Sequence, residues 1–362
     1  MQRAVTRQVL TPGARRIAVA QPLSGIGDMI WHVPHIRALS RHFGRPVTLI
    51  ASFRSAADQI FKADDAVEDV LFIERRPKGR TGRHDGPLGM IRLIAALRAR
   101  RLDALALLHH GRTLAFAALC AGIRQRSGYG VGLQRAFLNC GPYLGADSLR
   151  LHPFERASAW LAAAGIERAE SEPHLAIAPH SLAKARLFLG EGAKPVAIGI
   201  GSSEPFKQWG AARFAELAEK LIEAGWSRLV LIGGKPERPL AEEICARLGA
   251  KAGGVFVSTG WEIADVAALL SLSAFYVGND TGFMNMAAAT GLRSFCLFGG
   301  SAPFRHSAKI APILPPDGRP DRNGGMAKIT AAAAIAAIAA QGLAAPSGGT
   351  LPGAAGLPGK IL

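Results

Sequence analysis

The stretch VGNDTGFMNMAAATG, residues 277–291, sets a buried apolar run directly against a helix of small residues. The apolar run, residues 269–276, stops at Gly-Asn-Asp-Thr-Gly, and a helical pattern begins at Thr281. A carboxylate, a hydroxyl and a glycine therefore stand together at the first turn of a buried helix. Strand, turn and helix in this order are typical of a parallel β-sheet covered by helices.

The same alternation of strand and helix runs along most of the chain in two series. The first series has strands expected at residues 15–21, 45–52, 66–74 and 102–110. The second has strands expected at residues 196–203, 227–234, 254–258, 274–280 and 292–300. We therefore expect an α/β fold with two similar halves, each built on a parallel sheet.

The boundaries follow from where the pattern weakens. We expect a first domain of residues 1–175, a second of residues 176–342, and a disordered Pro/Gly/Ala-rich tail of residues 343–362. In such sheets ligands bind at the carboxyl ends of the strands, so the turns that follow the strands are where function is expected.

The composition is that of a folded soluble protein. Of the 362 residues, 49% are hydrophobic and 19% charged. No apolar run reaches the ~18 to 20 residues of a membrane-spanning helix, and the N-terminus has no apolar signal core. The four cysteines lie far apart, and His, Cys and Asp do not recur at metal-ligand spacing. We expect a cytoplasmic protein that uses neither a metal ion nor a cofactor.

The net charge of +16 is concentrated in the first half of the chain. Residues 74–101 hold nine basic and two acidic residues, including Arg75, Arg76 and Lys78. A solvated basic loop and helix is the plain reading, but the group as a whole would attract nucleic acid, anionic lipid or a phosphorylated substrate. Aromatic residues are absent between Phe72 and Phe116, so base stacking on single-stranded nucleic acid has no support there.

The turn PLSGIGDMI, residues 22–30, joins a strand to a helix. Gly25 and Gly27 would let the backbone approach a phosphate at the helix N-terminus. Ile30 stands where the third glycine of a dinucleotide fingerprint belongs, and no acidic residue follows the second strand, which disfavours a nicotinamide enzyme. Asp28 is left as a carboxylate at a helix start, either a capping residue or a general base.

Three turns of the second half offer groups that suit an anion. Ser202, Ser203 and Lys207 lie between a strand and a helix. Glu237 either accepts hydrogen bonds from ribose hydroxyls or caps the helix that follows it. At the opening stretch, Thr281, Gly282 and the next N–H groups form an anion cradle.

These segments together resemble the heptosyltransferases of lipopolysaccharide core synthesis, glycosyltransferase family 9, whose fold is GT-B. The similar segments, in the family's order, are IGDMIWHVPHIRAL, LHHGRT, HPFERASAWLAAAGI, GSSEPFKQWGAARFAELAEKL, IGGKPERPLAEEI and NDTGFMNMAAATG. Each segment alone is weak, but six in this order and spacing, over residues 15–341, are fairly specific. The resemblance implies two Rossmann-like domains that face each other across a cleft.

The resemblance also implies a reaction, which is an inverting, metal-independent transfer of a sugar, expected to come from ADP-heptose. Asp28 matches the family's catalytic base. The donor-binding residues implied are Ser202, Ser203, Lys207, Glu237, Trp261, Asp280, Thr281, Gly282, Phe283 and Asn285. Those expected to bind the acceptor are Gly25, Gly27, Arg75, Arg76, Lys78 and Arg112.

The partners expected are a nucleotide-sugar donor, a phosphorylated glycolipid acceptor and an anionic membrane surface, with no nucleic acid. The protein would act as a monomer at the inner face of the cytoplasmic membrane. The chain departs from the family's pattern at Asn285, where His is usual, and at Leu108, where Asp is common. Two alternatives stay open, namely a related enzyme that uses another nucleotide sugar for a different glycan, and a catalytically silent nucleotide-sugar-binding homologue.

Overall fold

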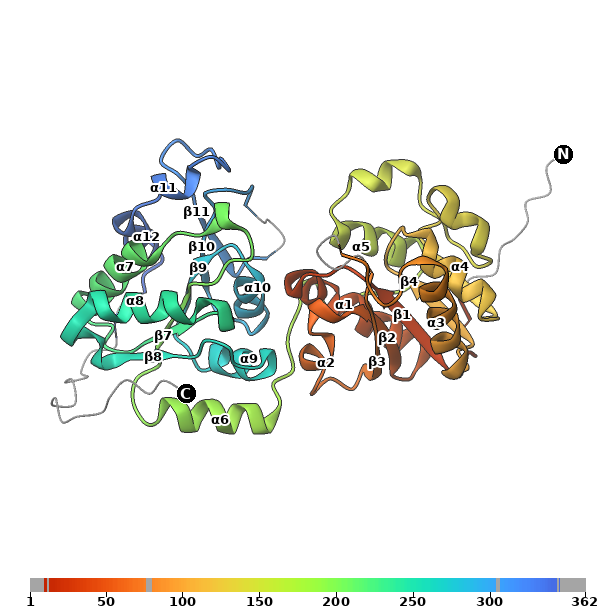
Figure 1. Ribbon diagram of the computed structural model, residues 1–362, viewed down its shortest axis with the longest axis horizontal. Helices are drawn as coiled ribbons and strands as arrows, with labels where there is room; N and C mark the ends of the chain where they lie inside the picture. Colours follow the sequence, from red (N-terminus) through yellow and green to blue (C-terminus); the bar gives the residue numbers. More distant parts are fainter. Residues whose placement is uncertain (1–9, 12, 76–79, 304–306, 344, 346–362) are drawn as a thin grey trace. The chain divides into compact units, whose positions relative to one another are not determined.

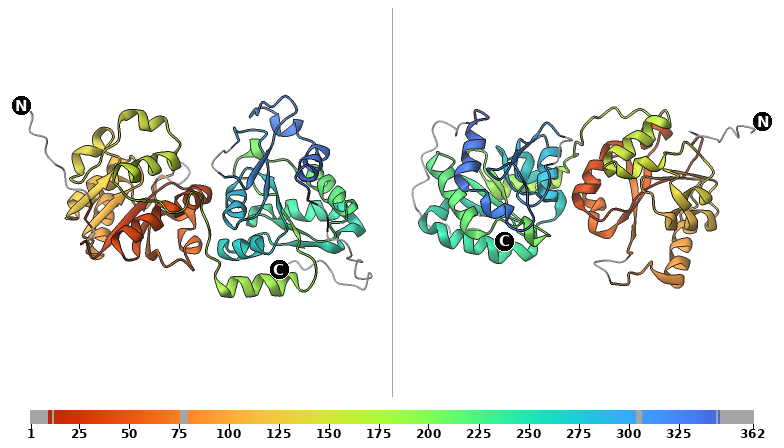
Figure 2. Two further views of the ribbon diagram at one scale, coloured as in Figure 1. Left: turned by 180° about the vertical axis from the view of Figure 1, so that it is seen from behind. Right: turned by 90° about the horizontal axis from the view of Figure 1, so that it is seen from above.

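The computed structural model describes residues 10–11, 13–75, 80–303, 307–343 and 345. The chain divides into two compact units, residues 1–176 and residues 177–362. Each unit has its own parallel sheet with helices on both faces (Figures 1 and 2). The predicted disordered tail falls almost wholly outside the described residues.

The first unit holds a five-stranded sheet in the order β3-β2-β1-β4-β5. Its strands are β1 (Ile17–Gln21), β2 (Val47–Ser52), β3 (Val67–Ile73), β4 (Ala104–Leu107) and β5 (Gln125–Gly128). Its helices are α1 (Ile26–Phe43), α2 (Ala57–Ile60), α3 (Gly86–Ala99), α4 (Arg112–Cys120) and α5 (Pro153–Ala163). Figure 1 shows α1 and α2 on one face of this sheet and α3 and α4 on the other.

The second unit holds a six-stranded sheet in the order β11-β10-β9-β6-β7-β8. Its strands are β6 (Val196–Gly199), β7 (Leu229–Ile232), β8 (Val255–Val257), β9 (Tyr276–Asn279), β10 (Ser294–Leu297) and β11 (Ile310–Ile313). Its helices are α6 (Pro179–Leu189), α7 (Ala211–Glu223), α8 (Arg238–Leu248), α9 (Ile263–Ser271), α10 (Gly282–Ala289), α11 (Gly325–Lys328) and α12 (Ala331–Ala339). All the strands predicted from the sequence are present, whereas β5, β11 and α6 were not predicted.

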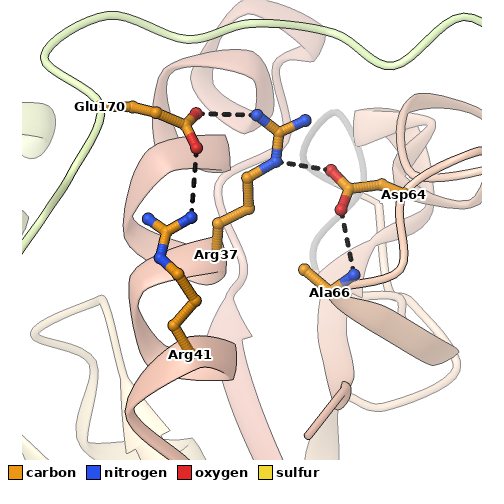
Figure 3. A network of polar contacts seen from close by, with 5 residues as sticks. All are labelled: Arg37, Arg41, Asp64, Ala66 and Glu170. Carbon is orange, nitrogen blue, oxygen red and sulfur yellow. Dashed lines mark hydrogen bonds and ion pairs between the residues drawn. The ribbon is translucent and has the colours of Figure 1, made fainter. Parts of the chain in front are cut away.

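An ion-pair network fixes the segment that leaves the first unit (Figure 3). Arg37 of α1 donates to Asp64 at 2.9 Å and to Glu170 at 2.7 Å, and Arg41 reaches Glu170 at 3.3 Å. Asp64 also accepts from the backbone N–H of Ala66 at 3.0 Å. The side chains of Arg37 and Asp64 are largely buried, so this network is screened less by salt than a surface ion pair would be. It holds the segment around Glu170 against α1.

Strands β6 and β9 approach so closely that glycine is required where they pair. Gly199 lies opposite Gly278 in the parallel register, and a Cβ atom on Gly278 would collide with the carbonyl oxygen of Gly199. We expect Gly278→Ala to lower the unfolding free energy by ~1–3 kcal/mol, as overpacking does. Gly253→Ala, where nothing lies within 4 Å of the added atom, is the matched control. Equal thermal midpoints for the two variants would contradict this reading.

Among the residues that the structure describes, no helix is both long enough and apolar enough to span a lipid bilayer.

Candidate active site

Each sheet has one place where the direction of strand order reverses. In the first unit it lies between β1 and β4, and in the second between β6 and β9. Neighbouring strands there send their helices to opposite faces, which leaves a crevice outside their carboxyl ends where ligands bind. The turns after β1 and β4 carry Asp28 and His109, and those after β6 and β9 carry Lys207 and Asp280. The residues with the greatest chemical interest therefore follow the strands at the two reversal points.

A pocket of about 290 Å³ lies at the carboxyl ends of β1 to β4 in the first unit. Its walls are formed by Pro22, Leu23, Ser24, Ser52, Ile73, Arg75, His109, Gly111, Thr113 and Leu114. Of the predicted acceptor residues, Arg75 lines this pocket, whereas Arg76 and Lys78 lie outside the described residues. Arg112 is exposed at the start of α4, and its neighbours, not Arg112 itself, form the wall.

Asp28 lies in the first turn of α1, directly after the loop that lines the pocket. Gly25 is the N-cap residue, and the Asp28 carboxylate accepts a hydrogen bond from the Gly25 backbone. A Cβ atom on Gly25 would lie 2.6 Å from Oδ2 of Asp28, so the absence of a side chain at Gly25 leaves room for the carboxylate in this position. Gly27 lies between them in the same helical turn. The capping interpretation thus describes part of what Asp28 does.

Burial gives Asp28 a second property, which capping alone does not require. Loss of water around the carboxylate raises its pKa above the ordinary aspartate value, and the hydrogen bond to Gly25 only partly offsets this. A carboxylate with a raised pKa holds a proton more readily at neutral pH. This is the property that a general base needs.

Buried polar side chains that sequence reasoning missed lie beside Asp28 and in the pocket wall. His32 contacts the Asp28 carbonyl oxygen at 2.6 Å and Gln21 at 3.1 Å. His109 accepts from the Gly111 N–H at 2.9 Å. Burial, helped by nearby histidines, lowers the pKa of both His32 and His109 to about 4, so both imidazoles are neutral near pH 7. The sequence signal was the pair His109-His110 at the end of a strand, which carries no metal-ligand spacing.

In the second unit, a lysine and an aspartate from two neighbouring turns form an ion pair. Lys207 Nζ lies 2.9 Å from Asp280 Oδ2 and 2.8 Å from Glu204 Oε2. Ser301 donates to the same Asp280 oxygen at 2.6 Å, a contact that the sequence did not predict. Burial alone would lower the pKa of Lys207, but hydrogen bonds and charges from Glu204 and Asp280 outweigh it and raise the pKa. Lys207 is therefore a permanent cation.

The N-terminus of α10 begins beside this ion pair. Thr281 is its N-cap residue and makes no side-chain capping hydrogen bond, while Asp280 is engaged by Lys207 and Ser301. The first N–H groups of a helix have no partner within the helix. Those of Gly282 and Phe283 are accordingly suited to an anion, which the dipole also favours. The Asn285 side chain donates back to the Thr281 carbonyl oxygen at 3.4 Å.

Glu237 lies close to the turn that follows β6. Its Oε2 accepts from the Gly234 N–H at 2.7 Å. A Cβ atom on Gly201 would lie 3.4 Å from the same oxygen and 3.5 Å from the Phe283 ring. Gly201 therefore brings the predicted ribose contact, Glu237, and the predicted phosphate cradle at Phe283 to one place.

The remaining predicted donor residues differ in their surroundings. Ser202 exchanges hydrogen bonds with the Glu204 backbone at 2.8 and 3.2 Å, and Ser203 is exposed. The Trp261 ring packs against Phe188 of α6, with ring centroids 4.6 Å apart, and lies 4.8 Å from Lys184 Nζ. The Trp261 side chain is thus used in packing, and its backbone N–H lies 3.4 Å from the Ser258 carbonyl oxygen.

Asn279 is a positioning residue that sequence reasoning did not single out. It is fully buried, and its Nδ2 contacts the carbonyl oxygens of Ile200 and Gly201 at 3.0 and 3.2 Å and Gln208 at 3.1 Å. It therefore joins the turn after β9 to the turn after β6. Asp280 and Lys207 stand next to these joined segments, so Asn279 fixes the spacing of the ion pair.

Two curated proteins are similar in sequence to this chain. Lipopolysaccharide heptosyltransferase 2 of Salmonella typhimurium is 26% identical over 245 residues, which cover 62% of this chain and 68% of that protein. The protein of the same name from Escherichia coli is 25% identical over 241 residues, covering 60% and 67%.

Two solved structures have the same fold. ADP-heptose lps heptosyltransferase II of E. coli superposes with a TM-score of 0.71 at 22% identity, over 90% of this chain and 98% of that one. A family 9 glycosyl transferase from Veillonella parvula gives 0.75 at 20% identity, over 92% and 98%. The α/β class and the two-domain GT-B fold expected from the sequence are thereby confirmed.

The family model described as glycosyltransferase family 9 (heptosyltransferase) matches residues 90–313, which is more than half of the chain. That match begins within α3 and covers the turn after β4 and the whole of the Lys207 and Asp280 region. The protein is a glycosyltransferase that belongs to glycosyltransferase family 9, the heptosyltransferase family.

Proposed function

We propose that this enzyme transfers a heptose from ADP-heptose to a hydroxyl of a lipopolysaccharide core acceptor, with inversion and without a metal ion. The observation that carries the proposal is the Lys207–Asp280 ion pair, 2.9 Å long, at the N-terminus of α10. It places the lysine cation, shared with the Asp280 and Glu204 carboxylates, at a strand-order reversal beside the first N–H groups of α10. The relatives named above are called lipopolysaccharide heptosyltransferases. One similar solved structure is an E. coli heptosyltransferase in complex with ADP.

The donor would bind the second unit. Its diphosphate would take the place of the half-exposed Glu204 carboxylate on Lys207 and accept hydrogen bonds from the first N–H groups of α10. Asp280, held by Lys207 and Ser301, would contact the sugar, and Glu237 the ribose. Positive charge placed before the reaction lowers the energy of the developing negative charge on the leaving group.

The acceptor would bind the pocket of the first unit. Asp28 would take the proton of the acceptor hydroxyl as its oxygen forms a bond to the anomeric carbon of the sugar. The bond from that carbon to the diphosphate breaks in the same step, and the electron pair leaves with the ADP. A single displacement of this kind inverts the anomeric configuration. Lys207 and the N-terminus of α10 would neutralise the negative charge of the leaving diphosphate, in place of a metal ion.

A second candidate keeps the fold and changes the donor. The observation that favours it is the Asn285 side chain, which is uncharged and directed to the Thr281 carbonyl oxygen. Asn285 brings no positive charge to the phosphates, whereas the histidine usual in the family can. The donor site would therefore differ from that of the family, which favours another nucleotide sugar.

Thermal stabilisation by nucleotides separates these candidates. ADP-heptose is expected to raise the thermal midpoint more than ADP does, and both more than UDP or GDP. At a hundred times Kd the gain is ~2.7 kcal/mol in unfolding free energy. A shift with UDP or GDP alone would support the second candidate. No shift with any nucleotide would contradict both candidates.

A further inference from the structure

Helix α3 exposes large aliphatic side chains on its outer face. Leu88 and Ile91 are 69% and 62% exposed, and they are three residues apart, which places them side by side on a helix. The opposite face, with Leu93 and Leu97, is fully buried in the core of the first unit. Single exposed aliphatic residues are common, but two neighbours on one helix face, continued one turn later by exposed Ala95, form an apolar ridge.

The charged side chains of α3 itself are all positive. The sequence of α3, GPLGMIRLIAALRA, contains no acidic residue, and Arg92 and Arg98 are exposed on the same face as Leu88 and Ile91. The carboxylate of Asp85, the N-cap residue, accepts a hydrogen bond from the Gly82 N–H at 2.8 Å. An apolar ridge flanked by arginines is the pattern of a helix that lies in the interface of an anionic bilayer, where it combines apolar burial with attraction to lipid headgroups.

The start of α3 is attached to the rim of the pocket. The backbone N–H of His84 donates to the Glu74 carbonyl oxygen at 2.9 Å, and the Glu74 N–H donates to His84 Nδ1 at 3.0 Å. Arg75, which lines the pocket, pairs with Asp85 at 3.5 Å. In the first turn of α3, Gly89 packs so closely on His84 that a Cβ atom would collide with its backbone. A surface bound by α3 is thus held next to the pocket.

We propose that the outer face of α3 docks on an anionic phospholipid bilayer, with Leu88 and Ile91 inserted among the lipids and Arg92 at the headgroups. The benefit of this docking, delivery of a membrane-held acceptor to the adjacent pocket, rests on the proposed function. The docking itself rests on the exposed side chains and charges of α3.

Sedimentation with vesicles tests the proposal. The full chain is mixed with vesicles of phosphatidylcholine alone and with vesicles containing phosphatidylglycerol. We expect binding to the anionic vesicles, weakened by salt and by Arg92→Glu. The double variant Leu88→Ser/Ile91→Ser should bind about tenfold more weakly, because two partly inserted aliphatic side chains are lost. The control is Leu187→Ser, since Leu187 is 83% exposed on α6 of the second unit, and it should bind like the native protein.

Three results would overturn the proposal: no binding of the native protein to anionic vesicles, unchanged binding of the double variant, or an equal loss with Leu187→Ser. The thermal midpoint of the same variants without ligand reports their folding, and stabilisation by ADP-heptose reports the proposed donor site of the second unit. If the double variant loses vesicle binding while no variant binds the donor, the docking surface stands and the proposed function fails.

Discussion

Replacing Asp28 by Asn is expected to lower the turnover number by about a hundred- to ten-thousandfold, the usual contribution of a positioned base. Asn keeps the size of the side chain but is unable to take the acceptor proton. Donor affinity should stay unchanged, because the proposed donor residues lie in the second unit. Asp58→Asn is the matched control, since Asp58 also lies in the first turn of a helix of the first unit but is exposed.

The raised pKa of Asp28 adds a pH signature to this prediction. Activity should fall as the pH drops through the pKa of the folded protein, which burial places above the ordinary aspartate value. The protonated form is favoured in the folded state, so the charged carboxylate costs stability at every pH above that pKa. Asp28→Asn removes this cost. Its thermal midpoint at pH 7 should equal or exceed that of the native protein while its activity is lost.

An Asp28→Asn variant that keeps its turnover would remove the base from the mechanism. One that loses activity together with a large part of its thermal stability would show that Asp28 acts as a capping residue of α1. The activity–stability split therefore separates the two interpretations that the sequence left open.

Replacing Lys207 by Met should lower kcat/KM by about a hundred- to a thousandfold, as the loss of one group that stabilises a leaving anion does. The variant also leaves Asp280 and Glu204 as neighbouring carboxylates without their shared cation. Binding of ADP should weaken together with turnover, since Lys207 in the proposed donor site would contact the diphosphate before and during transfer. Titration of ADP by calorimetry and steady-state kinetics measure the two effects.

Lys220→Met provides the control, because Lys220 lies on α7 of the same unit and its Nζ forms a long ion pair with Glu216 at 3.9 Å. Normal ADP affinity and kcat/KM in Lys207→Met would contradict the donor site. Lys207→Arg should recover part of the ADP affinity, since it restores the charge but changes its geometry.

The strands and the turns after them could be predicted from the sequence because apolar runs ending in Gly, Asp or Thr are local signals. The Asp280–Gly282 turn is the best case. Strands β5 and β11 gave no such signal. The first, QRSG, is polar, and the second, IAPI, contains Pro312, which edge strands tolerate since one side of the strand is unpaired.

The side-chain geometry of the site could be predicted only in part. The roles of Lys207 and Asp280 followed from resemblance, but their pairing depends on the adjacency of β6 and β9. These strands begin at Val196 and Tyr276, 80 residues apart in the chain. Ser301 joins Asp280 from a third turn for the same reason. The space that Gly25 leaves for Asp28 is a matter of side-chain packing, which no sequence pattern encodes.

Transfer itself is the most direct measurement of the central claim. The purified protein is incubated with ADP-heptose, EDTA and truncated lipopolysaccharide cores, and the product is followed by mass spectrometry and its anomeric configuration by NMR. We predict addition of one heptose with inverted configuration, which persists in EDTA and is lost in Asp28→Asn. The absence of transfer from ADP-heptose, together with transfer from a UDP- or GDP-sugar, would contradict the account.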